Sequence, residues 1–64
     1  MKTDYINQSE KCINLIDTIL KLEDDLLEAN PIESCEICLK IKTGLKILHK
    51  ENSVYIKMIN KELK

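Results

Sequence analysis

The chain has no tryptophan, phenylalanine or arginine, and it has only one glycine and one proline among its 64 residues. Two tyrosines are its whole aromatic content. The scarcity of glycine and proline removes the turn residues on which chains of many short strands depend, and the glycine-rich loops that hold phosphates are missing. The remaining composition, rich in Ile, Leu, Lys and Glu, is typical of a chain that is helical throughout.

The length predicts a single domain, residues 1–64, whose own core is too small to stabilise it well. A chain of this size buries only about 60% of its unfolded surface, so a disulfide, a metal or a partner is expected to add stability. Three cysteines without a cysteine-rich pattern argue against a disulfide scaffold, which leaves oligomerisation, most simply a homodimer. Neither a signal peptide nor a membrane-spanning apolar run of about 20 residues is visible, so we expect a cytoplasmic protein that does not bind membranes.

One turn is predicted, at Asn30, directly before the only proline. Proline disfavours the helical conformation in the residue before it but suits the first position of a new helix. Asn30 is a favoured N-cap, and Glu33 stands where its side chain can reach back to the backbone N–H of the cap, as in a capping box. We therefore predict an all-α antiparallel hairpin with a first helix over about 4–29 and a second over about 31–63.

The first helical segment has a wide apolar arc. Placing residues 100° apart gives an arc of roughly 200°, twice the width that packing against one helix requires. The arc therefore predicts two neighbours, and the hairpin is expected to complete a four-helix bundle by dimerising or by binding a partner, in an orientation that the pattern leaves open. Its members recur in rows of seven: Ile6, Ile13, Leu20 and Leu27, then Cys12, Ile19 and Leu26, with Leu15, Ile16 and Leu22 beside them.

The second segment keeps its apolar phase past Asn52, which favours one unbroken helix, with a break near Asn52 as the alternative. Being longer, it is expected to project beyond the first helix by a turn or two at the C-terminal end. Gly44, in its interior, costs roughly 1 kcal/mol relative to alanine. It indicates either a kink, a close crossing with the other helix or a tolerated surface position.

No catalytic residues and no cofactor are predicted. Cys35 and Cys38 have the spacing of half a zinc site, and Cys12 of a second copy could approach Cys38 in an antiparallel dimer. Buried free cysteines more often act as small apolar side chains. His49, the only histidine, has no convincing serine or cysteine to activate. No paired carboxylates or triad are apparent, and the chain is too short to enclose a pocket, so an enzyme is not expected.

Two surfaces are candidates for binding. Ile47, Val54 and Met58 form an apolar stripe roughly opposite the main arc of the second helix, and Leu15 and Leu22 are predicted to remain uncovered on the first helix. A lysine ridge on the second helix could contact phosphates or an acidic partner; it consists of Lys42, Lys46, Lys50 and Lys57.

These features favour a small protein-binding regulator, inhibitor or chaperone-like adaptor that packs its apolar helix faces into a groove. In length, two-helix layout and expected dimerisation the chain also resembles the Rop-type RNA-binding bundle, a similarity of architecture without a shared residue motif. That resemblance implies a dimeric RNA-binding protein that uses the lysine ridge. The net charge of −1, the lack of arginine and the near absence of aromatic side chains make this the second choice.

Overall fold

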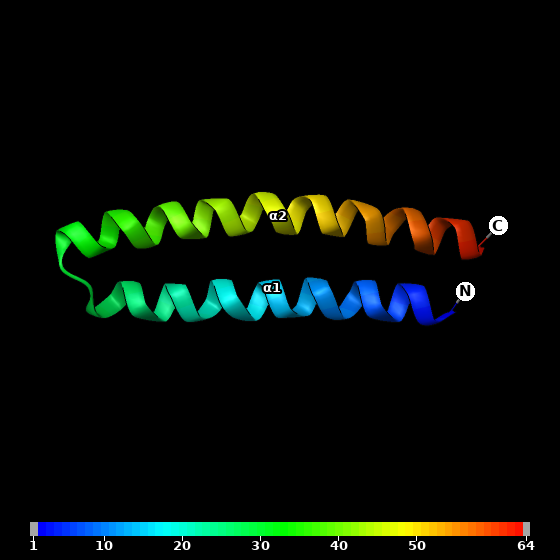
Figure 1. Ribbon diagram of the computed structural model, residues 1–64, viewed down its shortest axis with the longest axis horizontal. Helices are drawn as coiled ribbons and strands as arrows, with labels where there is room; N and C mark the ends of the chain where they lie inside the picture. The colour runs from blue at the N-terminus through cyan, green and yellow to red at the C-terminus, as the bar shows by residue number, and fades with distance from the viewer. Residues whose placement is uncertain (1, 64) are drawn as a thin grey trace.

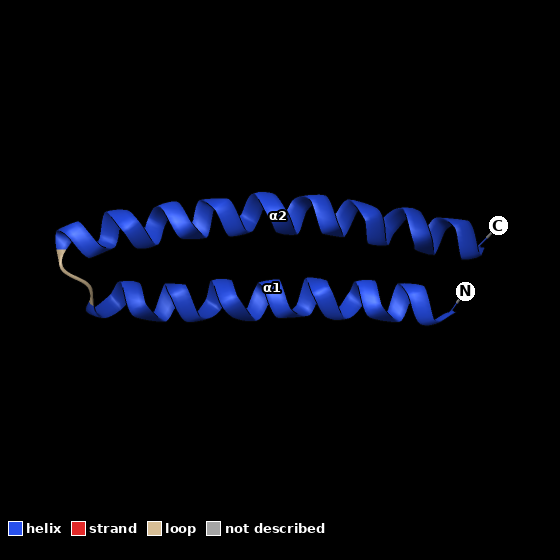
Figure 2. Ribbon diagram, viewed as in Figure 1, coloured by secondary structure: helices blue, strands red, loops and turns tan. Residues whose placement is uncertain are grey.

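The chain folds into two long antiparallel helices joined by one short turn (Figure 1). In the computed structural model, which describes residues 2–63 and the side chains of residues 4–63, helix α1 spans Lys2–Glu28 and helix α2 spans Pro31–Leu63. The hairpin measures 50 × 15 × 12 Å. The described residues contain no strand (Figure 2), so the predicted all-α hairpin is confirmed, whereas a four-helix bundle is not shown by this single chain.

The turn is made as the proline predicts, with one difference in the cap. The Glu33 backbone N–H donates to Asn30 Oδ1 at 2.9 Å, and the Ser34 N–H donates to the Asn30 carbonyl at 2.8 Å. Glu33 does not reach the backbone N–H of the cap, because its Oε1 accepts instead from the Asn30 side-chain amide at 2.9 Å. Both polar ends of the Asn30 side chain are thereby satisfied at the start of α2.

Helix α2 is continuous through Asn52, so the alternative with a break there is wrong. The Ser53 hydroxyl donates to the His49 carbonyl one turn earlier, at 2.9 Å. This bond satisfies the hydroxyl within the helix, where serine otherwise competes for the backbone in non-helical conformations. The segment therefore stays helical despite two residues of modest helix propensity.

The helices pack along a regular seam of buried and half-buried residues that recur at alternating intervals of three and four. The seam residues are Tyr5, Gln8, Cys12, Leu15, Ile19, Leu22, Leu26 and Ala29 of α1, and Ser34, Ile37, Ile41, Gly44, Leu48, Glu51, Tyr55 and Met58 of α2. Gly44 lies opposite Ile19: a Cβ added to Gly44 would be 3.1 Å from Ile19 Cγ1. Of the roles predicted for this glycine, the close helix crossing is the one observed.

The predicted overhang of α2 at the free end is present but shorter than a turn or two, because the register set by Ile19 and Gly44 leaves only about half a turn of it. Counting outward from this pair, Lys2 lies opposite Lys61, and α2 ends only two residues later, at Leu63. α2 extends past α1 at both ends (Figure 1); by the same count it does so by four residues at the turn, because Glu28 lies opposite Cys35 and α2 begins at Pro31. Over the described residues neither helix has a stretch long and apolar enough to cross a membrane.

Candidate protein-binding face

Very few residues of the seam are fully buried. Among the described residues only Cys12 and Gln8 are buried, at 8% and 5% exposure. Gln8 is held by Glu51 of the other helix: its Nε2 donates to the Glu51 carbonyl at 2.8 Å and to Glu51 Oε2 at 2.7 Å. A polar pair therefore occupies one level of the seam, where it satisfies its own hydrogen bonds and restricts the register at which the helices can pair.

A second apolar surface lies on one side of the hairpin. A residue that directly follows a seam residue is rotated about 100° around its helix, and in an antiparallel pair this step leads to the same side for both helices. Seven large apolar side chains follow seam residues and are exposed, and an eighth, Leu63, continues the row of Ile56 seven residues later. We call them the apolar face: Ile6, Ile13, Ile16, Leu20 and Leu27 of α1, with Leu45, Ile56 and Leu63 of α2.

The other side of the hairpin is almost entirely polar. The residues of α1 that directly precede seam residues are Asp4, Asn7, Lys11, Asn14, Thr18, Lys21, Asp25 and Glu28. On α2 the equivalent positions include two exposed apolar side chains, Ile47 and Val54. One side of the hairpin is thus mainly apolar along α1 and mixed along α2, where the exposed Lys42, His49 and Asn52 also follow seam residues, and the other side is almost entirely polar. Such an uneven distribution is expected of a helix pair that packs a single face against a further layer.

The total surface indicates that this layer is missing from the single chain. A compact monomer of 7.4 kDa would expose about 4,200 Å², whereas the hairpin exposes 5376 Å². The excess, roughly 1,200 Å², exceeds the ~800 Å² that each partner buries in a standard protein interface. One such interface would remove about two thirds of this excess.

The apolar face has rims of opposite charge. On α1 an acidic rim lies outside the apolar row, with each carboxylate between successive apolar residues: Glu10, Asp17 and Asp24. On α2 the corresponding outer positions hold one charged residue, Lys46, beside the uncharged Leu39, Ser53 and Asn60. Lys42 directly follows Ile41 of the seam and so lies within the face, one turn from Lys46. We call Lys42 and Lys46 together the lysine rim. All five side chains are exposed, and the described structure contains no ion pair between the two groups.

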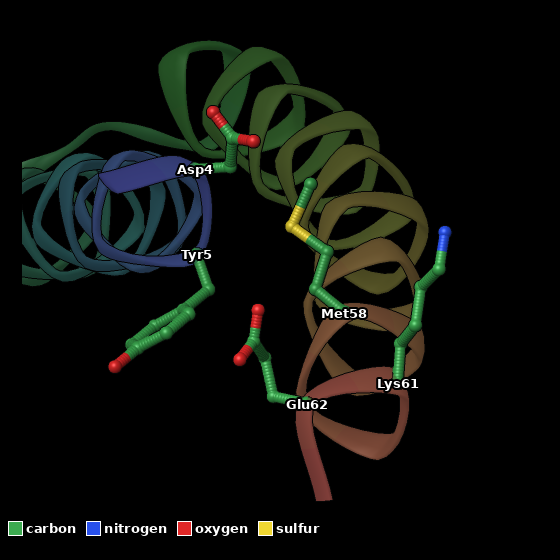
Figure 3. A pocket seen from close by; sticks show the side chains of 5 residues that line it. All are labelled: Asp4, Tyr5, Met58, Lys61 and Glu62. Atoms are coloured by element: carbon green, nitrogen blue, oxygen red, sulfur yellow. The ribbon is translucent and has the colours of Figure 1, made fainter. Parts of the chain in front are cut away.

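Of the predicted apolar stripe, only two members are exposed. Ile47 and Val54 are 46% and 38% exposed on the polar side of the hairpin. Met58 is half-buried in the seam, where it lines a hollow at the free end with Asp4, Tyr5, Lys61 and Glu62. In Figure 3 the Met58 side chain lies between the two helices, whereas that of Lys61 points away from α1. The three residues therefore do not form one open patch.

The prediction that Leu15 and Leu22 are uncovered is wrong, because both are half-buried seam residues that face α2. Their binding role in any complex stays a prediction. The lysine ridge of Lys42, Lys46, Lys50 and Lys57 is exposed along its whole length, as a binding surface requires. Around the helix axis these lysines turn from the apolar face at Lys42 to the polar side of the hairpin at Lys50 and Lys57, so they do not form one straight row.

The three cysteines are free and are not brought together. Cys12 is buried in the seam, whereas Cys35 and Cys38 are exposed near the turn. Within the described residues no cluster of three or more His, Cys, Asp or Glu side chains could hold a metal ion. A zinc site between two copies is not tested by the structure of one chain.

Sequence reasoning placed Ile6, Ile13, Leu20 and Leu27 in the arc but did not separate them from the seam row that contains Cys12, Ile19 and Leu26. The signal that could have separated the rows is the spacing of the small and polar residues. Gln8, Cys12 and Gly44 all fall on the three-and-four pattern of the seam. Small residues at such positions let the two helices approach each other closely, as they do at Gly44.

Comparison with known proteins gives no relationship on which to build: no family model matches the chain, and no curated protein or solved structure is similar enough to count as a relative.

Proposed function

We propose that this chain is a small non-enzymatic protein-binding module, a regulator, inhibitor or adaptor that docks its apolar face against helices of a partner. The observation that carries the proposal is the gathering of eight exposed large apolar side chains on one side of a hairpin whose other side is polar. Exposed apolar patches of this extent are typical of interaction surfaces.

The shape of the face supports packing against helices. Along α1 its apolar residues are spaced three, four and seven apart, the spacing of ridges that interdigitate with the grooves of a neighbouring helix. Along α2 they are eleven and seven apart, which keeps them on the same side of that helix. The proposal also places the protein in a reducing compartment such as the cytoplasm, where the exposed Cys35 and Cys38 stay as thiols.

Two matched pairs of substitutions test which side of the hairpin binds. Ile13→Asn with Ile16→Asn alters the apolar face at residues that are 53% and 43% exposed. Ile47→Asn with Val54→Asn alters the polar side at residues of similar exposure, 46% and 38%. Ile, Val and Asn have similar helix propensities, so both pairs should leave the helices intact.

The measurement is affinity capture from an extract of the cells that produce the protein, combined with light scattering of the purified variants. We expect the Ile13/Ile16 pair to lose the captured protein, or the self-association, that the unmodified chain shows. The Ile47/Val54 pair should retain it. Equal binding by all three proteins would refute a role for the apolar face. Loss of binding only in the Ile47/Val54 pair would show that the binding site is the apolar stripe predicted from the sequence.

A further inference from the structure

We propose that the partner on the apolar face is a second copy of this chain, related to the first by a two-fold axis parallel to the helices, so that α1 of each copy packs beside α2 of the other. This inference rests on the proposed function and names the partner that it leaves open. The assembly is a four-helix bundle with both turns at the same end.

A symmetric dimer buries the same patch on both copies, so the patch must be complementary to itself. The apolar face meets this requirement because its two rims differ in sign: the acidic rim of Glu10, Asp17 and Asp24 on α1, and the lysine rim of Lys42 and Lys46 on α2. A surface that binds a partner carrying charge of a single sign needs only the opposite charge along its edges.

The register of the hairpin shows which charges such an axis brings together. Rotation about an axis parallel to the helices keeps every residue at its own height. Gly44 lies opposite Ile19, so Lys46, two residues later, is at the height of Asp17, two residues earlier. Lys42 is three residues from the height of Asp24, about 4.5 Å along the helix, which a lysine side chain can span.

The other face-to-face arrangement, with the turns at opposite ends, stacks α1 on α1 and α2 on α2. It sets the acidic rim of one copy beside the acidic rim of the other and likewise joins the two lysine rims. Like charges at adjoining positions disfavour that arrangement. The rims therefore select the dimer in which α1 meets α2.

The surface area is consistent with one partner of the same size. The excess of roughly 1,200 Å² over a compact monomer is enough for the ~800 Å² that each copy contributes to a stable dimer. Burial of the face would also supply the core that the single hairpin lacks, since among its described residues only Cys12 is a buried apolar residue.

Charge exchange tests both the partner and its orientation. The variant with Asp17→Lys and Asp24→Lys makes the α1 rim basic where it faces the lysines of the second copy; Glu10, at the height of the uncharged Ser53, is left unchanged. The variant with Lys42→Glu and Lys46→Glu makes the facing positions on both helices acidic. Combining all four substitutions exchanges the signs at these positions and restores their complementarity. Because Lys has a better helix propensity than Asp, and a cation is favourable near the end of α1, the first variant should not lose helicity.

The measurement is the dimer dissociation constant from sedimentation equilibrium at low salt, with helicity followed by circular dichroism. We expect the unmodified chain to dimerise, each two-residue variant to dimerise about tenfold more weakly, and the four-residue variant to regain the original constant. Equal constants for all four proteins would overturn the proposed orientation.

An unmodified chain that stays monomeric up to millimolar concentration would overturn the second copy as the partner. The proposed function would survive that result if capture by the chain still depends on Ile13 and Ile16. Capture that is insensitive to Ile13 and Ile16 would refute the proposed function instead, so the two failures are distinguishable.

Discussion

Gln8 provides the sharpest test of how the two helices are held together. Its Nε2 donates both to the Glu51 carbonyl and to Glu51 Oε2, at 2.8 and 2.7 Å, and the side chain is only 5% exposed. Gln8→Glu keeps the shape of the side chain but replaces the donor with a carboxylate oxygen. The variant therefore places that oxygen against two acceptors in a partly buried site.

The expected loss follows from the two bonds. A hydrogen bond to a charged group contributes about 1.5–3 kcal/mol and a neutral one about 0.5–1.5 kcal/mol, so the free energy of unfolding should fall by about 2–4 kcal/mol at pH 7. This is a large part of the roughly 3–10 kcal/mol expected for a chain of 64 residues.

The assay is urea unfolding followed by circular dichroism at one fixed protein concentration at pH 7. Asn7→Asp is the matched control, because it makes the same amide-to-carboxylate change one residue earlier at an exposed position, and it should change stability by less than about 0.5 kcal/mol. If Gln8→Glu unfolds at the same urea concentration as this control at pH 7, the bonds to Glu51 do not hold the seam and the reasoning fails.

Two further substitutions test the turn and the close helix crossing. Asn30→Ala removes the cap of α2 and should lower the free energy of unfolding by about 1 kcal/mol, seen as a melting temperature about 4–8 °C lower; an unchanged melting temperature would contradict the role of the cap. Gly44→Val should destabilise the hairpin by about 1–2 kcal/mol although valine is the better helix former, because its side chain must displace Ile19. A rise in melting temperature for this variant would show that the helices separate without cost at this level.

The sequence alone was sufficient for the elements and for the place where the chain reverses. Asn30 and Pro31 act within a few residues of themselves: the proline ring restricts the backbone before it, and the asparagine side chain caps the helix after it. The apolar arc of α1 was also readable, because helical periodicity depends only on the positions of apolar residues along the chain. Its excess width correctly indicated that one neighbouring helix would leave apolar side chains exposed.

The tertiary structure decided which half of the arc faces the other helix. The row of Ile6, Ile13, Leu20 and Leu27 is the more uniformly apolar, yet it is the one left exposed. The row behind it packs in the seam because rotation about the helix axis is set by contacts between residues far apart in the chain: the bonds of Gln8 with Glu51 and the fit of Ile19 against Gly44. Periodicity gives the width of an apolar arc, but only the partner helix fixes the direction in which it points.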